Sequence, residues 1–229
     1  GPDAESVALA WRFPGVSDKD FEILQVVSQV LYNGKAGLID LDLNQQQKVL
    51  NSYGYPMGLA DYSAFILGGL PKQGQTLEEV KDLLLNEIKK LRAGEFDEKM
   101  LQANINNFKL YELQSMESNE GRADIFVNSF INGTNWEDEV TAIDRMAKLT
   151  KEDIVAFADK YLKEDNYAVV YKKQGKDPNE KKMTKPEITP IVSNRDVASP
   201  FLKAHRTCIP RLQERYEPAD SEIRHSGTL

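Results

Sequence analysis

The sequence predicts an α+β fold in which helices cover a largely antiparallel sheet. Four segments have the apolar pattern of strands, and amphipathic segments with helical spacing fill the chain between them. Because strands and helices do not alternate one by one, as the units of a parallel sheet would require, an antiparallel arrangement is favoured. The predicted strands are 6–13, a segment starting near 51, 62–70 and 166–172.

The N-terminal strand, Ser6 to Phe13, is apolar on both of its faces, which predicts a strand buried on both sides. Pro14-Gly15 ends it. Ser17 with Asp20 is then the predicted N-terminal cap of a helix that ends at Asn33-Gly34.

The next segment predicts a helix and then a hairpin. Residues 38–50 have a weak helical pattern that runs to Val49 or Leu50. A strand starting near Asn51 is predicted to pair with the strand Tyr62–Leu70, through a turn at 57–59.

A long amphipathic helix follows the hairpin. Thr76 can cap its first turn while Glu79 reaches back to the cap, the pattern of a capping box. Gly94 ends the helix, and Asp97 is predicted to cap the next one. The apolar face of the long helix is formed by Leu77, Val80, Leu84, Ile88 and Leu91.

Helices dominate the second half of the predicted domain. They are expected from Asp97 to about 117, interrupted or weakened at 119–121, and again over 123–131 and 136–149. Thr150 with Asp153 caps the last helix, and the strand 166–172 ends the regular structure.

The composition divides the chain into three parts. Residues 1–173 are predicted to form a single domain, and 174–203 an extended, Pro-containing linker. Residues 204–229 contain both histidines and the only cysteine but no lysine, so we interpret them as a peripheral, vector-derived or disordered tail.

Charge and length exclude several classes of function. A net charge of -7 argues against a nucleic-acid surface. No apolar run approaches 18 residues, so no membrane span is predicted. The start lacks a signal peptide and runs almost directly into a strand, which suggests a piece of a longer chain. The compartment is undetermined, with bacterial periplasm and cytoplasm as the candidates.

No catalytic or metal-binding motif is present. His205 and His225 fit no zinc spacing, and no H-x-x-E-H exists. Cys208 has no partner constellation for a nucleophile. Gly68-Gly69 lacks the phosphate-binding pattern and is interpreted as a bend that admits a close backbone. We therefore predict no catalytic residue, metal or cofactor in this chain.

Three tyrosines around the hairpin are the candidate binding residues. Tyr53, Tyr55 and Tyr62 would be exposed on an edge strand, and such a strand can receive an extended peptide. Cross-strand packing between the rings is the alternative explanation for the same pattern.

Three tracts together resemble one known family. They are the strand-turn Trp11-Arg12-Phe13-Pro14-Gly15 with Ser17-Asp18-Lys19-Asp20, the helix end 83–96, and Leu149 to Ile154 with Lys160-Tyr161-Leu162. In order and spacing they resemble the insulinase/pitrilysin-like zinc metallopeptidases, which include the mitochondrial processing peptidase. The resemblance covers about residues 3 to 192.

The resemblance implies a non-catalytic domain with the processing-peptidase or LuxS-like fold. Such a domain would form part of a peptide-binding chamber and pack on a zinc-bearing domain elsewhere in a parent hydrolase. The partners implied are other domains of the same polypeptide and a peptide or unfolded-protein substrate. A homodimer of the fragment is a further candidate. The isolated chain is expected to be inactive.

One family feature tests for direct participation in catalysis. Some non-catalytic domains supply an Arg and a Tyr in an L-R…Y pattern before the hairpin. Here Leu43 is followed by Asn44, and Tyr53 and Tyr55 lie at a longer spacing. The resemblance therefore implies a wall of the chamber. A non-enzymatic scaffold of the same fold and an unrelated enzyme are the alternatives.

Overall fold

The structure, a computed structural model, describes residues 3–176, 199–200 and 203. The chain divides into two units, 1–180 and 181–229. In the second unit, the backbone N–H of Lys203 donates to the Ser199 carbonyl at 2.9 Å. The predicted tail, 204–229, and most of the predicted linker lie outside the described residues. The account below concerns the first unit.

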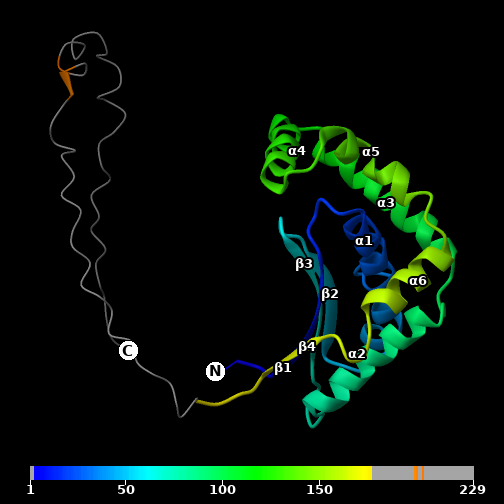
Figure 1. Ribbon diagram of the computed structural model, residues 1–229. Coiled ribbons are helices and arrows are strands. Elements are labelled where there is room, and N and C mark those ends of the chain that lie inside the picture. The colour runs from blue at the N-terminus through cyan, green and yellow to red at the C-terminus, as the bar shows by residue number, and fades with distance from the viewer. Residues whose placement is uncertain (1–2, 177–198, 201–202, 204–229) are drawn as a thin grey trace. The chain divides into compact units, whose positions relative to one another are not determined.

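The first unit contains a four-stranded antiparallel sheet in the order β2-β3-β1-β4 (Figure 1). Leu9 at the centre of β1 lies opposite Leu67 of β3 and Val169 of β4. The α+β class and the antiparallel sheet are confirmed. The strands are β1 Ser6–Pro14, β2 Asn51–Met57, β3 Tyr62–Leu70 and β4 Ala168–Lys172.

Helices cover one face of this sheet and leave the other open (Figure 1). Those that pack on the sheet are α1 Lys19–Leu31, α2 Leu77–Arg92 and α6 Lys151–Tyr161. Beyond them lie α3 Lys99–Ser115, α4 Asn119–Asn132 and α5 Trp136–Met146. Among the described residues, no helix is long and apolar enough to cross a membrane.

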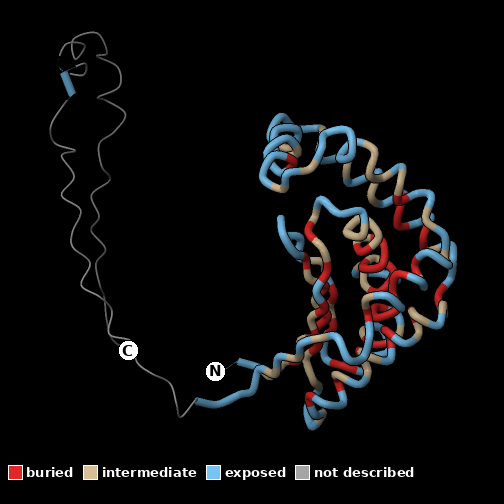
Figure 2. The backbone as a smooth tube through the Cα atoms, viewed as in Figure 1, coloured by how far each residue is buried: buried red, intermediate tan, exposed pale blue. Residues whose placement is uncertain are grey.

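The core lies between the sheet and the helices, where Figure 2 shows the buried residues together. Alternate residues of β1 supply its centre: Leu9, Trp11 and Phe13 are almost wholly buried. Phe13 stacks on Phe157 of α6, with ring centroids 5.7 Å apart. β1 is thus buried fully on its helix-facing side, whereas Arg12 on the opposite side is exposed. The prediction of burial on both sides was too strong.

Helix α2 forms as the sequence predicts. Thr76 and Glu79 form the reciprocal capping box, and the five predicted apolar residues are buried. Gly94 follows the helix with a φ of +71°, a left-handed conformation that glycine adopts without a steric penalty. The capping box of Thr150 and Asp153 on α6 is also confirmed.

Several predicted boundaries were wrong: the helix predicted over 136–149, for example, ends at Met146. The carboxylate of Asp18, not Ser17, caps α1 and accepts the Asp20 N–H at 2.8 Å. The helix predicted to reach Leu50 ends as a short π-helix, η1 Asp40–Asn44, because the side chain of Asn44 bonds to the next strand. The break before α4 falls at 116–118, where Ser118 caps the new helix.

Candidate peptide-contact face and sheet edge

The open face of the sheet carries all three candidate tyrosines. Strand residues point alternately to the two faces, and Tyr53 and Tyr55 share the face of β2 that looks away from the helices. Tyr62 begins β3 on the same side. Tyr55 is 46% and Tyr62 57% exposed, whereas Tyr53 is half-buried. Their role as peptide contacts stays a prediction.

The tyrosines form two groups on this face. The rings of Tyr53 and Tyr55 stack with centroids 6.2 Å apart. Tyr62 lies instead with Arg12 of β1, whose guanidinium carbon is 4.9 Å from the ring centroid. The three tyrosines therefore show both of the expected features. Tyr53 is half-buried and packs on Tyr55, while Tyr55 and Tyr62 are exposed to solvent.

Gly68 and Gly69 make room for side chains on the two faces. A Cβ atom at Gly68 would meet the Tyr53 ring at 2.3 Å, and one at Gly69 would meet Val80 of α2 at 2.5 Å. The strand continues through both to Leu70. The interpretation as a bend for a passing backbone was wrong, because an aromatic ring and a helix side chain fill the space.

The free edge of β2 is partly closed by Asn44. Its Oδ1 accepts the Ser52 amide N–H and the Ser52 hydroxyl, both at 2.8 Å, and its Nδ2 donates to the Ser52 carbonyl at 2.9 Å. The backbone groups of Ser52 therefore point away from β3. In an antiparallel pair this direction alternates, so Gly54 and Pro56 also present their backbone groups to the edge.

This geometry leaves little for a strand to pair with at the β2 edge. The backbone N–H and carbonyl of Ser52 are already bonded to Asn44, and Pro56 has no N–H to donate. Between them, Gly54 alone offers both a donor and an acceptor. An extended peptide that bound here by strand addition would make few backbone bonds, so the open face with its tyrosine rings is the better contact surface.

Asn44 also occupies the position after Leu43 where the resemblance raised the question of an arginine. Its amide is consumed by Ser52, which is fully buried. Leu43 is fully buried too. The side chain after Leu43 therefore holds the sheet edge and is engaged within the domain.

A charge cluster that joins Asp42 of η1 to Lys90 and the buried Glu87 of α2 was not predicted from the sequence. Lys90 of α2 donates to Asp42 at 2.6 Å and to Glu87 at 2.9 Å. The hydrogen bond from Lys90 lowers the pKa of Asp42, whereas burial raises the pKa of Glu87. The second oxygen of Glu87 has no hydrogen-bond partner among the described residues. Only the Glu87–Lys90 spacing of three residues could have signalled this cluster.

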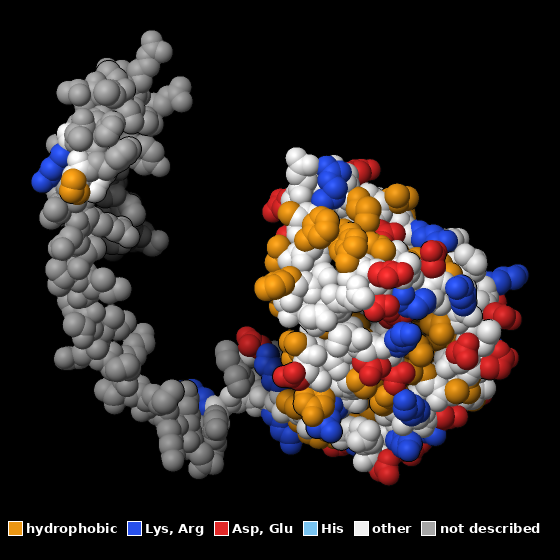
Figure 3. Space-filling model, turned by 45° about the horizontal axis from the view of Figure 1, so that its top comes forward, with side chains coloured by type: hydrophobic (Ala, Val, Ile, Leu, Met, Phe, Trp, Pro, Cys, Tyr) orange, Lys and Arg blue, Asp and Glu red, His pale blue; other side chains and the backbone are white. Residues whose placement is uncertain are grey.

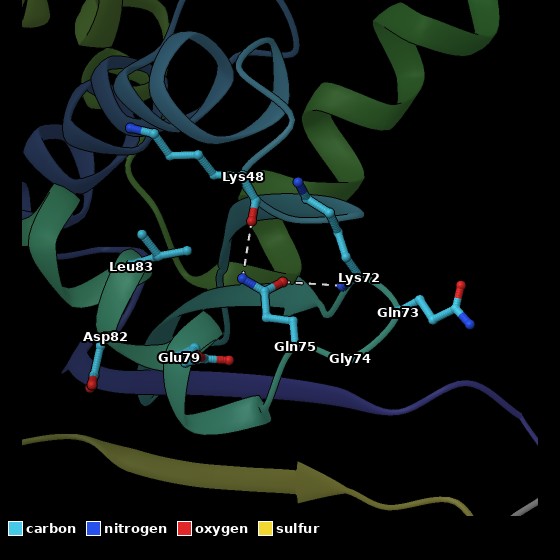
Figure 4. A pocket seen from close by; sticks show the side chains of 8 residues that line it. All are labelled: Lys48, Lys72, Gln73, Gly74, Gln75, Glu79, Asp82 and Leu83. Carbon is cyan, nitrogen blue, oxygen red and sulfur yellow. Dashed lines mark hydrogen bonds between the residues drawn. The ribbon is translucent and has the colours of Figure 1, made fainter.

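A hollow of about 670 Å³ lies beside the turn between β3 and α2 (Figure 4). Two of its polar side chains, those of Gln75 and Glu79, bond within the fold. The Gln75 amide donates to the Lys48 carbonyl and accepts from the Lys72 N–H, both at 3.0 Å. Glu79 bonds to Thr76 in the capping box. These residues brace the turn and do not converge on an empty centre.

The described residues contain no group of three His, Cys, Asp or Glu side chains arranged to hold a metal ion. His205, Cys208 and His225 lie outside the described residues. The absence of metal and of catalytic residues from the whole chain stays a prediction.

A one-sided antiparallel sheet with capped helices and an open aromatic face defines an α+β domain. Residues 1–108 match the family described as the peptidase M16 inactive domain. The match confirms, over this part of the chain, the resemblance to the zinc metallopeptidases that the three tracts predicted.

Relatives agree with this assignment. The chain is 27% identical over 178 residues to zinc protease PqqE of Helicobacter pylori, a match that covers 76% of this chain and 39% of that protein. The chain thus spans about two fifths of the length of that relative.

Two solved structures share the fold. A Helicobacter pylori protease matches with a TM-score of 0.69 and 22% identity, over 73% of this chain and 40% of the other. The inactive peptidase domain of a proposed zinc protease from Bordetella parapertussis matches with a TM-score of 0.68 and 17% identity, over 78% and 97%.

Proposed function

We propose that this domain forms one wall of the peptide-binding chamber of a zinc metalloendopeptidase and packs on the domain that carries the zinc. The observation that carries this proposal is the one-sided sheet, whose open face presents tyrosines while helices cover the other face (Figure 1). The named relative is a zinc protease of greater length, which leaves room for a zinc-bearing domain. The domain itself contributes shape and contacts, and no cleavage step.

Substrate contact is assigned to the rings of Tyr55 and Tyr62. A tyrosine offers a large rigid surface at low entropic cost together with a hydroxyl, which suits unfolded peptides of varied sequence. The Asn44–Ser52 contact supports this mode, because it leaves few backbone groups on the β2 edge for strand addition.

The test is a kinetic comparison in the protease that contains this domain. Tyr55→Ala and Tyr62→Ala are expected to raise KM for unfolded peptides several-fold while kcat stays unchanged, since the rings bind without taking part in chemistry. Tyr111→Ala is the matched control, because Tyr111 is 62% exposed but lies on α3. An unchanged KM in both variants would contradict the assignment.

A scaffold with no catalytic partner is the second candidate function. The Asn44–Ser52 contact favours it, because the side chain after Leu43 is an amide engaged within the domain and not an arginine that could reach a neighbouring active site. If no domain of the parent polypeptide contains H-x-x-E-H, the scaffold function is supported. If one domain contains that motif, the chamber-wall function is supported.

A further inference from the structure

Helices α4 and α5 expose more apolar surface than their own packing explains. We define the α4–α5 patch as Phe126, Val127, Phe130 and Ile131 of α4 with Trp136 and Val140 of α5. All six are more than 40% exposed, and Phe130 reaches 88%. Figure 3 shows hydrophobic side chains gathered at the top of the first unit.

The patch is continuous and ordered by its own contacts. Phe126 stacks on Trp136 with centroids 4.4 Å apart, which joins the two helices. The α4–α5 turn is fixed by Ser129, whose hydroxyl donates to the Thr134 carbonyl at 3.0 Å. Ser129 is the one buried residue of α4. The helix therefore turns its apolar side chains outward and holds them there.

Carboxylates accompany the apolar side chains. On α4, Glu120, Asp124, Val127 and Ile131 follow one another at spacings of four, three and four residues, so they share one helical stripe. Residues 119–146 contain six carboxylates, Glu120, Asp124, Glu137, Asp138, Glu139 and Asp144, against two arginines, a balance of -4.

The two arginines offset only part of this charge. Arg122 donates to the Met116 carbonyl and to Asn119 at the start of α4. Arg145 forms a fork with Glu22 of α1 and bonds to Thr141. It also lies 3.7 Å from a carboxylate oxygen of Asp138, so it offsets one of the six carboxylates. The balance of six carboxylates against two arginines therefore leaves the surface around the patch negative.

We infer that the α4–α5 patch is a docking surface for a polypeptide segment that presents apolar side chains flanked by Lys or Arg. Apolar burial supplies the attraction, and the carboxylates select a cationic partner over an anionic one. The inference stands apart from the peptide-contact role of Tyr55 and Tyr62, because those rings lie on β2 and β3 whereas the patch lies on α4 and α5.

Area and charge limit the occupant to such a segment. The exposed fractions of the six side chains correspond to on the order of 600 Å² of apolar surface, less than the roughly 800 Å² per partner of a standard interface between folded proteins. A segment fits this area. A second copy bound patch to patch would place carboxylates against carboxylates, which is repulsive.

The probe is a 14-residue amphipathic peptide of Leu and Lys, compared with a matched peptide of Leu and Glu. Trp136 reports binding, because the other tryptophan, Trp11, is only 1% exposed. The Leu/Lys peptide should protect Trp136 from acrylamide quenching and bind at least tenfold more tightly than the Leu/Glu peptide at low salt. Added salt should reduce this difference.

Two variants and a control make the test specific. Phe130→Ser should weaken Leu/Lys binding about tenfold, and the double variant E120K/D124K should reverse the peptide preference. Leu50→Ser, also at an exposed apolar residue, should change neither. Thermal unfolding of each variant verifies that the fold is intact.

Three results would overturn the inference. They are equal binding of both peptides, no binding of either, and Leu/Lys binding that survives Phe130→Ser. Concentration-dependent dimerisation that Phe130→Ser abolishes, seen by sedimentation velocity, would also overturn it and assign the patch to a second copy.

Discussion

Asn44 and Ser52 are joined by three hydrogen bonds of 2.8 to 2.9 Å, which tie the end of η1 to the free edge of β2. The side-chain amide of Asn44 pairs with the backbone of Ser52 as the backbone of a neighbouring strand would. One side chain therefore both ends a helix and protects the sheet from strand addition.

Replacing Asn44 by Ala should destabilise the domain by about 2 kcal/mol, because the buried N–H and hydroxyl of Ser52 lose their partners. Urea unfolding measures the loss, and hydrogen exchange at the Ser52 amide should accelerate. Asn44→Asp should have an intermediate effect, since it keeps the acceptor and loses the donor to the Ser52 carbonyl. Gln46→Ala, at an exposed neighbour, is the control. Equal stability of Asn44→Ala and Gln46→Ala would refute this role.

The two adjacent glycines of β3 should differ in their tolerance of a methyl group. Gly68→Ala collides with the end of the Tyr53 ring, which can swing away on the open face, so a cost of about 1 kcal/mol is expected. Gly69→Ala collides with fully buried Val80 and should cost about 2 to 3 kcal/mol. Urea unfolding of both variants provides the comparison. A larger loss for Gly68→Ala would show that Tyr53 is held firmly.

Glu87 should make stability depend on pH above the ordinary glutamate pKa of 4.5. Burial raises its pKa in the folded state, so folding favours the protonated form. This contribution is present below pH 4.5 and is lost as pH rises through the raised value. Lys90 and Asp42 are the charged groups that face Glu87. The hydrogen bond from Lys90 lowers the pKa of Asp42, so the titration of Asp42 affects stability only below pH 3.8.

Glu87→Gln removes this titration but keeps an oxygen for Lys90. The free energy of unfolding of the variant should therefore rise relative to that of the unsubstituted chain as pH increases from 4.5 to 8. Urea unfolding at several pH values measures the difference. Parallel pH profiles for the two proteins would show that Glu87 is ionised at little cost.

The elements that the sequence predicts well depend on neighbouring residues. The capping boxes of α2 and α6 are visible because Thr76 with Glu79, and Thr150 with Asp153, are three residues apart. The hairpin of β2 and β3 is signalled by its own alternation and turn. Local spacing is sufficient wherever a bond joins residues of one helical turn or one hairpin.

The features that were missed depend on contacts between distant segments. Lys90 meets Asp42 only after α2 packs beside η1, 48 residues apart in sequence. The carboxylate of Asp18 could not be separated from the neighbouring Ser17 as a cap without backbone geometry. The tyrosines were correctly expected at the hairpin, but their division between the Tyr53–Tyr55 stack and the Arg12–Tyr62 contact depends on β1 lying next to β3.

The central claim, that this is a non-catalytic domain, is tested most directly by zinc content and peptidase activity of the purified 229-residue chain. Elemental analysis after dialysis and a quenched fluorogenic peptide give both quantities on one sample. The account predicts far less than one zinc per chain and no cleavage that EDTA abolishes. One tightly bound zinc per chain together with EDTA-sensitive cleavage would contradict it.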